Sequence, residues 1–376
     1  MKSVCRIGAC WAVLWLLTIA VGRCGAGEAE DWRDKMATIV PLGYVCHYTS
    51  NPIVVDGKLD DAAWEGAPWT SYFVDIQDHN LPTPRFRTRV KMLWDDKFLY
   101  IGAELEEPHV WATLTNHDSV IFLDPDFEVF MDPDWDTHAY YEFEMNALNT
   151  TWDLMLNKPY MDKGTPNNAW EIPGDKTAVH IDGTLNDPSD TDKGWTVEIA
   201  FPWSVLGEHA RHPGPPNEGE EWRINFSRVE WHITTDGGHE RKVPHTPEDN
   251  WVWSPQGVID MHRPEMWGLL EFTKKGENVA VAPIPGKPAH DLALEIYYSE
   301  RDFQKFNGRW ATNLVELQWD RGRLPADVQL PVIEVTPGGY KCSVDFMESG
   351  QRHVWRIRED RLLKYDEAMP DEETLP

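Results

Sequence analysis

Basic residues are scarce in this chain of 376 residues, in which 35 Lys and Arg stand against 63 Asp and Glu and give a net charge of -28. A negative field of this size repels nucleic acid and anionic lipid, so neither is an expected partner. The acidic residues are scattered among 20 Trp and 41% hydrophobic residues. A disordered acidic tail therefore does not explain the charge, and the apolar content suffices for one large or two modest cores.

Cysteine is also rare. Three of the five cysteines fall in the first 26 residues, which leaves Cys46 and Cys342 in the rest of the chain. There is no CxxC pair and no zinc-type spacing. In an oxidising compartment the two residues could form a disulfide, which the chain-entropy model values at roughly 4 kcal/mol or more for so long a loop. The alternative is that they are two unrelated buried thiols.

The N-terminus lacks an apolar run long enough to span a membrane, because residues 7–21 fall short of the roughly 20 residues required. Lys2 and Arg6 precede this run, and Cys24-Gly25-Ala26 follows it. Small residues at this place suit a signal peptidase. We therefore predict a cleaved signal peptide over residues 1–26, a secreted or periplasmic location, and no membrane attachment after cleavage.

A different signal comes from residues 124–156, which read as three β-strands joined by acidic turns. From Tyr140 to Ala147, apolar residues alternate with polar ones, and the polar positions include Glu142, Glu144 and Asn146. The preceding strand places Glu128 opposite its apolar residues. One face of these strands should therefore be core, and the other should carry carboxylate and amide groups toward a polar ligand.

Long amphipathic helices are missing before residue 290, whereas short alternating segments recur between Gly, Pro, Asn and Asp turns. This pattern predicts an all-β fold, an antiparallel β-sandwich of the jelly-roll or immunoglobulin-like type. A hairpin is expected over residues 87–106. We assign residues 27–45 to a linker, 46–275 to the sandwich and 276–290 to a Pro-rich linker.

A small α+β appendage is predicted over residues 291–365, and an acidic tail over 366–376. Asp291 can cap a helix that ends at Gly308. Three strand-like pieces follow at residues 332–335, 340–346 and 353–357.

Several phrases of the sequence resemble, in this order, the family 9 carbohydrate-binding modules. They are VDGKLDDAAW, VKMLWDDKFLYIGAELEEP, DFEVFMDPD, YYEFEMNALNTTWDLML, GWTVEIAFPW, WRINFSRVEW and WVWSPQGVIDMHRPEMWGLLEF. The resemblance covers about residues 46–272. It implies a β-sandwich of the DOMON-like superfamily that grips the end of a sugar chain between two aromatic rings, with calcium in a structural role.

Residue by residue, the resemblance places Trp253 in the aromatic clamp and makes Glu128 a carboxylate that hydrogen-bonds the sugar. Such partners suit a pyranose, whose apolar face stacks on an indole and whose hydroxyls need charged or amide groups. The second clamp position holds no tryptophan; Phe122 is the nearest candidate. Trp111 or Trp135 could substitute from a loop. Glu144 stands where the family carries an arginine, and Asn146 continues this row.

The residues Asp132, Asp134 and Asp136 have the alternate spacing that lets carboxylates converge on a hard cation. These residues could therefore hold a structural calcium, and an acidic turn that holds no ion is the alternative. The same superfamily includes secreted haem b domains with Met and His ligands. Candidates for such a pair lie on or near predicted strands: Met92, Met145, His180 and His232.

The leading hypothesis is a secreted, non-catalytic carbohydrate-binding protein. The first alternative is a carbohydrate-active hydrolase that uses Glu128, Glu142 and Glu144, because glycosidases place two carboxyl groups about 5 to 9.5 Å apart. The sequence offers no nucleophile elbow, HExxH or GxxxxGK motif for other chemistries. The third hypothesis is a haem-binding electron-transfer domain.

Overall fold

The computed structural model describes residues 38–366, apart from residues 79 and 277–278. The predicted signal peptide, most of the first linker and the acidic tail from residue 367 lie outside the described residues. Within the described range, no helix is long and apolar enough to cross a membrane.

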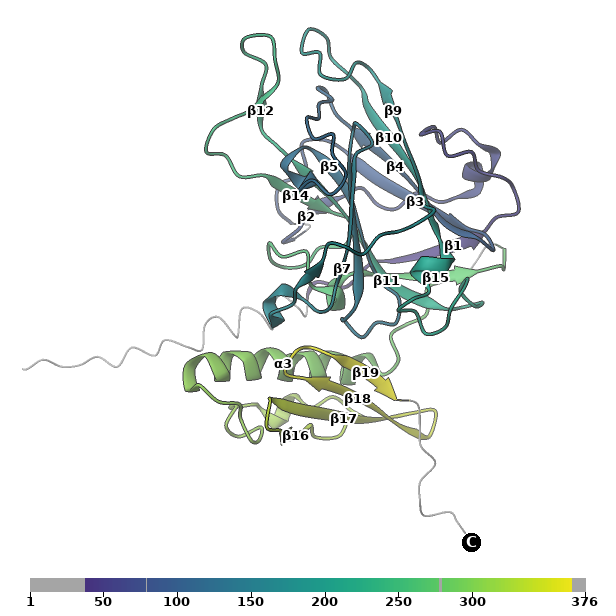
Figure 1. Ribbon diagram of the computed structural model, residues 1–376. Coiled ribbons are helices and arrows are strands. Elements are labelled where there is room, and N and C mark those ends of the chain that lie inside the picture. The colour runs from purple at the N-terminus through teal and green to yellow at the C-terminus, as the bar shows by residue number, and fades with distance from the viewer. Residues whose placement is uncertain (1–37, 79, 277–278, 367–376) are drawn as a thin grey trace, which may run out of the picture.

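A curled 13-stranded sheet forms the body of the molecule (Figure 1). Its strands are β1 (Gly43–Tyr48), β2 (Val74–Asp75), β3 (Thr88–Trp94), β4 (Phe98–Glu106), β5 (Asp126–Asp132), β6 (Tyr140–Asn146), β7 (Thr151–Leu156), β8 (Pro166–Asn167), β9 (Lys176–Asp182), β10 (Gly194–Pro202), β11 (Glu221–Glu230), β14 (Asp249–Val252) and β15 (Gly268–Thr273). The order is β8-β7-β6-β5-β11-β15-β1-β3-β4-β10-β9, with β14 on β11 and β2 on β14. A separate hairpin joins β12 (Ile233–Thr234) and β13 (Arg241–Lys242).

The predicted antiparallel sandwich is confirmed. All pairs in the large sheet are antiparallel except those of β1, which runs parallel to β15 and β3. The expected hairpin is formed by β3 and β4 in register from Thr88↔Leu105 to Trp94↔Leu99. Residues of β5 and β6 alternate as predicted, so that Phe127, Val129 and Phe143 lie in the main apolar core.

Short helical turns connect the strands: η1 (Ala62–Gly66), η2 (Ile121–Leu123), η3 (Tyr160–Asp162), α2 (Trp203–Leu206), η4 (Pro264–Met266) and η5 (Arg321–Arg323). Two of them, η2 and η3, stand next to β5–β7 in the chain and bring aromatic residues toward these strands.

The C-terminal unit, residues 287–366, contains α3 (Lys287–Asn307), β16 (Val332–Val335), β17 (Tyr340–Glu348), β18 (Gln351–Arg358) and β19 (Leu363–Asp366). Helix α3 packs on β17 and β18 and lies between their sheet and the sandwich (Figure 1). It ends at Gly308 as predicted, where a left-handed glycine donates its amide to Gln304. It begins at Lys287 rather than at Asp291, which lies inside the helix and accepts from Lys287 instead of capping.

Cys46 and Cys342 are both free, so the pairing considered from the sequence is absent. Cys46 belongs to the core of the sandwich, and Cys342 belongs to the separate core of the C-terminal unit. Each side chain is packed among apolar residues of its own core. The structure therefore corrects the disulfide interpretation to two buried thiols.

Candidate functional site

A row of carboxylates lies on the faces of β5 and β6 that point away from the sandwich core. Glu128 pairs with Glu144 across the strands, while Glu142 and Asp126 extend the row along β6 and β5. The exposed fractions are 0% for Asp126, 6% for Glu128, 6% for Glu142 and 1% for Glu144. We call these four residues the acidic face. The sequence correctly indicates that Glu128, Glu142 and Glu144 share one side of the strands, but it indicates neither the place of Asp126 among them nor their burial.

Four aromatic residues from separate segments border the acidic face, and we call them the rim. The amide of Phe122 donates to Glu144 Oε2 at 3.0 Å, and Trp231 Nε1 donates to the Phe122 carbonyl at 3.1 Å. Trp152 stands opposite Glu144 on β7. Tyr160 in η3 lies near the β6 carboxylates, whose charges add to burial in raising the pKa of Tyr160 to about 12. Phe122 is 37% exposed and Tyr160 is 44% exposed, so ring surface is available to a ligand.

Burial raises the pKa of every carboxyl in the acidic face. The pKa of Glu142 rises to about 8 through burial and then through the charge of Glu128. Burial raises the pKa of Glu128 to about 7, although hydrogen bonds with Ser227 and Asp126 oppose the shift. The pKa values of Asp126 and Glu144 are held well above their usual range by burial and neighbouring carboxylates. Burial and mutual repulsion thus disfavour the charged form of these carboxyls, and donors or a positive charge supplied by a ligand would offset that cost.

Trp253 is a core residue, which corrects its predicted role in an aromatic clamp. Its ring is only 2% exposed and packs against Phe226, with 6.0 Å between ring centroids. An indole enclosed in this way has no free face for a sugar. The two loop alternatives, Trp111 and Trp135, are also buried, at 6% and 7% exposure. Of the candidates considered from the sequence, Phe122 alone reaches the rim.

Asn146 is likewise structural, although it shares the side of Glu144. Its Oδ1 accepts the amides of Leu148 and Thr150 and so closes the turn between β6 and β7. Its Nδ2 donates to the Leu114 carbonyl at 2.9 Å and to Asp124 Oδ2 at 3.0 Å. With its donors and acceptor engaged and 0% exposure, Asn146 has no group left for a ligand, contrary to the sequence prediction.

Asp132, Asp134 and Asp136 converge at the turn between β5 and β6, where one carboxylate oxygen of each lies within 4.8 Å of the others. Asp132 is buried; its Oδ2 accepts the Thr137 amide at 2.9 Å, and its Oδ1 has no hydrogen-bond partner. Lys364 lies 3.7 Å from Asp136 Oδ2 and supplies one opposing charge. Three carboxylates with an unused buried oxygen fit the donor set of a hard cation.

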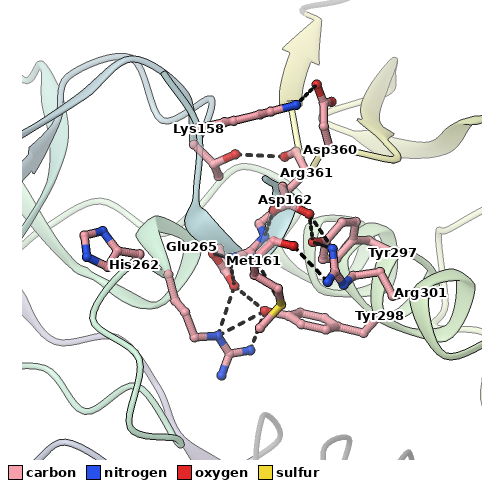
Figure 2. A network of polar contacts seen from close by, with 12 residues as sticks. Lys158, Met161, Asp162, His262, Glu265, Tyr297, Tyr298, Arg301, Asp360 and Arg361 are labelled. Atoms are coloured by element: carbon pink, nitrogen blue, oxygen red, sulfur yellow. Dashed lines mark hydrogen bonds and ion pairs between the residues drawn. The ribbon is translucent and has the colours of Figure 1, made fainter. Parts of the chain in front are cut away.

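The C-terminal unit contacts η3, the turn that begins at Tyr160, through Met161 and Asp162 (Figure 2). Asp162 Oδ1 accepts from the Tyr297 hydroxyl at 2.5 Å and from Arg301 Nη1 at 2.6 Å. Arg301 Nη2 also donates to the carbonyl of Met161 at 3.0 Å. These contacts fix both residues that follow Tyr160 in η3.

Arg361, in the turn between β18 and β19, joins the same network (Figure 2). Its guanidinium is fully buried, 3.2 Å from Asp162 Oδ2 and 2.9 Å from Glu265 Oε2. The carbonyl of Arg361 accepts from Thr137 Oγ1 at 2.8 Å, and the Leu363 amide donates to the Asp136 carbonyl at 3.1 Å. One turn of the C-terminal unit therefore contacts both η3 and the turn that carries the three aspartates.

The structure does not bring the haem candidates together. Met92 and Met145 lie in the apolar core with 0% exposure, whereas His180 and His232 are exposed. A Met–His axial pair would need the two kinds of side chain to face one another across a common cavity.

Two cavities lie away from the acidic face. One, of about 580 Å³, is lined by β4, β9 and β10 together with Tyr72 and Arg87. The other, of about 600 Å³, lies between residues 39–41 and α3. Neither is lined by the acidic face or by the rim.

Residues 55–214 match the model of a family described as carbohydrate family 9 binding domain-like. This part of the chain is similar to the family 9 carbohydrate-binding modules, and we call it the family 9-like domain. The match includes the acidic face and three residues of the rim, and it ends before Trp231. The family 9-like domain thus supplies most of the site, while β1, β11, β14 and β15 complete the sandwich around it.

Two curated relatives align with the family 9-like domain. Exoglucanase XynX of Acetivibrio thermocellus is 30% identical over 159 residues, which are 41% of this chain and 12% of that protein. Endo-1,4-beta-xylanase A of Thermoanaerobacterium saccharolyticum is 30% identical over 157 residues, 41% of this chain and 11% of that protein. The chain therefore spans only about an eighth of the length of these relatives.

Solved structures with a similar fold include a family 9 module of Caldicellulosiruptor kristjanssonii in complex with cellotriose. It is 19% identical, with 64% of this chain and 98% of that chain covered and a TM-score of 0.40. A putative carbohydrate-binding protein of Bacteroides uniformis is 16% identical, with 62% and 100% covered and a TM-score of 0.45.

Proposed function

We propose that the protein binds a carbohydrate at the acidic face and that the rim stacks against the sugar. The observation that carries the proposal is a set of buried carboxylates with few internal donors, bordered by partly exposed aromatic rings. Sugar hydroxyls supply the donors that these oxygens lack, and a pyranose face matches an aromatic ring. The match of residues 55–214 to the family 9 binding domains supports the same ligand class.

Within this proposal, Glu128 and Glu142 are the carboxylates that reach the sugar, since each retains 6% exposure. Glu144 is more deeply buried and positions Phe122 through its backbone amide. Phe122 and Tyr160 provide the most exposed rings of the rim. Net affinity should be modest, because each sugar hydroxyl exchanges water for protein at a gain of about 1 kcal/mol or less.

A structural calcium at Asp132, Asp134 and Asp136 is part of the proposal. The ion would neutralise three converging carboxylates and use the free Oδ1 of Asp132. Because the same turn contacts the C-terminal unit, calcium there would stiffen that contact.

We also propose that the protein acts outside the cytoplasm. The sequence of residues 1–26, with basic residues, an apolar run and small residues at its end, supports export. Retention of residues 1–26 in protein recovered from the medium or periplasm would contradict the signal-peptide prediction.

The test is a glycan array with purified protein, followed by calorimetry with soluble forms of the oligosaccharides that bind on the array. Phe122→Ala and Tyr160→Ala should each weaken binding about two- to tenfold, since a favourable aromatic contact contributes about 0.5 to 1.5 kcal/mol. Matched controls are Phe306→Ala on α3 and Tyr72→Ala, whose parent residues are 63% and 45% exposed. Binding lost in Tyr72→Ala but kept in Tyr160→Ala would move the site to the 580 Å³ cavity.

The same samples test the hydrolase alternative. A carboxyl with a raised pKa can act as a general acid, and the pKa of Glu142 is about 8. A binding protein should leave the oligosaccharides intact over hours, as judged by chromatography. Product release that disappears in Glu142→Gln would establish the hydrolase instead.

A further inference from the structure

The acidic face contains a second convergence of carboxylates, separate from the turn with three aspartates. One oxygen each from Asp126, Glu128 and Glu144 lies within 4.8 Å of the others. All three residues are at least nine-tenths buried. Three carboxylates this close cannot all stay charged in a protein interior unless a positive partner is bound; without one, protons must neutralise part of the cluster.

Several other buried carboxylates of the chain have partners that offset their charge. Arg228 lies 2.7 Å from Glu107 and 2.8 Å from Glu230, both of which are buried. Arg361 does the same for Glu265 at 2.9 Å. Asp124, next to Asp126 in the chain, instead receives donors on both oxygens from Thr113, Leu114 and Asn146.

Within the part of the chain that the structure describes, no arginine or lysine forms an ion pair with the acidic face, and its hydrogen-bond donors are few: the Val229 amide to Asp126, the Phe122 amide to Glu144 and Ser227 to Glu128. The largest charge effects on the pKa values of Asp126 and Glu144 come from other carboxylates. Lys242 is within reach of the field of Asp126, but its ammonium lies over the Trp231 ring, 3.3 Å from the centroid.

Individual atoms point to a missing partner. Asp126 Oδ1 accepts the Val229 amide at 3.0 Å, whereas the buried Oδ2 has no hydrogen-bond partner. Glu142 Oε2, beside the cluster, is buried and unpartnered as well. Glu144 is anchored at one oxygen by the Phe122 amide. The side chains are thus held in place by one set of atoms while others remain free to coordinate.

We propose that Asp126, Glu128 and Glu144 bind a hard divalent cation, with Ca²⁺ as the preferred ion. An all-oxygen donor set without His or Cys disfavours zinc and copper and suits calcium, which takes six to eight oxygen ligands. Calcium in this place leaves coordination positions on the side of Glu142 and the rim. That last step rests on the proposed function: sugar hydroxyls can complete the coordination of the ion.

The test counts ions in the absence of any sugar, by native mass spectrometry and calcium calorimetry on the full protein. Glu144→Gln and Glu128→Gln should each lower the stoichiometry by one ion per chain. Asp134→Asn should remove only an ion bound at the turn. Unchanged stoichiometry and affinity in both glutamine variants would overturn the proposal, whatever Asp134→Asn does.

A stability measurement guards against a variant that simply misfolds. In chelator, Glu144→Gln should have a Tm equal to or above that of the wild type, because a buried charge has been removed. Added Ca²⁺ should raise the Tm of the wild type more than that of Glu144→Gln. An equal calcium-induced rise in both proteins would contradict a site at the acidic face.

Glycan binding is then measured with and without chelator. Ion loss in Glu144→Gln together with no glycan binding by the wild type would leave the cation site standing and remove the proposed function. Glycan binding by the wild type with no ion lost in either glutamine variant would remove the cation site and leave the proposed function standing.

Discussion

Trp253 and Phe122 are both candidates for sugar stacking in the sequence, yet they occupy opposite environments. Trp253→Ala should destabilise the protein by about 3 to 5 kcal/mol, because it empties a large buried volume, and should leave glycan affinity of the folded protein unchanged. Phe122→Ala should change the free energy of unfolding by less than about 1 kcal/mol and weaken glycan binding. Urea denaturation and calorimetry together separate the two effects. Equal stability losses in both variants would contradict this division.

Cys46 and Cys342 give a second test at the level of single residues. Because each thiol is buried in a different core, alkylation should modify them only after denaturation, and a reductant should not change the Tm. Peptide mass spectrometry of samples alkylated before and after unfolding checks this. A peptide pair linked through Cys46 and Cys342 in unreduced protein would show that the two cores rearrange to allow pairing.

The sequence identifies which side of a strand a residue occupies better than what that residue contacts. Alternation correctly places Glu128 and Glu144 together, because side chains in a strand have a strict period of two. It places Asn146 with them as well, but the side-chain oxygen of Asn146 already accepts backbone amides of the turn that follows it in the chain. Trp253 and its neighbour Val252 point to opposite sides of the chain. Only the packing of β14 on β11 decides that the indole side enters the core.

At the level of elements, strands and turns with strong local signals are predicted well. The hairpin of β3 and β4 has both alternation and an Asp-Asp-Lys turn. The helix end at Gly308 depends on one residue that tolerates a left-handed backbone. The start of α3 is missed because no side-chain cap marks it: Gly286 precedes the helix, and Pro288 fits its first turn.

The turn between β18 and β19 should couple the C-terminal unit to the proposed sugar site. Arg361→Met removes the buried cation between Asp162 and Glu265 and leaves each with one other arginine, Arg301 and Arg263 respectively. It should therefore cost about 3 kcal/mol of stability, the lower end for a broken buried ion pair. It should also weaken glycan binding in the folded protein, because η3 and Tyr160 lose part of their support. Chemical denaturation and calorimetry below the unfolding transition measure the two effects.

The control for this variant is Arg352→Met on the same strand pair. Arg352 bonds Asp345 at the surface with 56% of its side chain exposed, so its loss should cost less than about 1 kcal/mol. Glycan affinity should not change. If Arg361→Met binds glycan as tightly as Arg352→Met does, the C-terminal unit contributes to stability alone and does not position the site.

At the level of the whole molecule, most of the covering of the acidic face could not be predicted, since Phe122 is the one rim residue that the sequence offers as a candidate. Phe122, Tyr160 and Trp231 come from three connections that are distant in sequence, and each lies in a segment without periodicity. Nothing local relates η3 to the turn of the C-terminal unit that holds it. The long loops do mark the region in which binding residues gather, but the identity of the rim depends on tertiary contacts.

The pH dependence of folding should reflect buried acids outside the proposed metal sites. Burial, the largest cause, raises the pKa of Glu221 to about 7 and that of Glu300 to about 7. A carboxyl whose pKa is higher in the folded state than in the unfolded state binds its proton more tightly when folded. Stability from these groups is therefore greatest at low pH within the window from about 4.5 to 7, and it falls as pH rises through that window.

Glu300→Gln isolates one of these groups, because the amide oxygen can still accept from Ala311. The variant should be more stable than the wild type at pH 8, by about 1 kcal/mol, and should lose part of the decline in stability between pH 5 and pH 8. Glu316→Gln is the control: hydrogen bonds from Arg309 lower the pKa of Glu316 to about 2, so its contribution is lost only in stronger acid. Urea denaturation in chelator at four pH values gives the slopes. A wild-type slope retained in Glu300→Gln would mean that this carboxyl is hydrated in the folded protein.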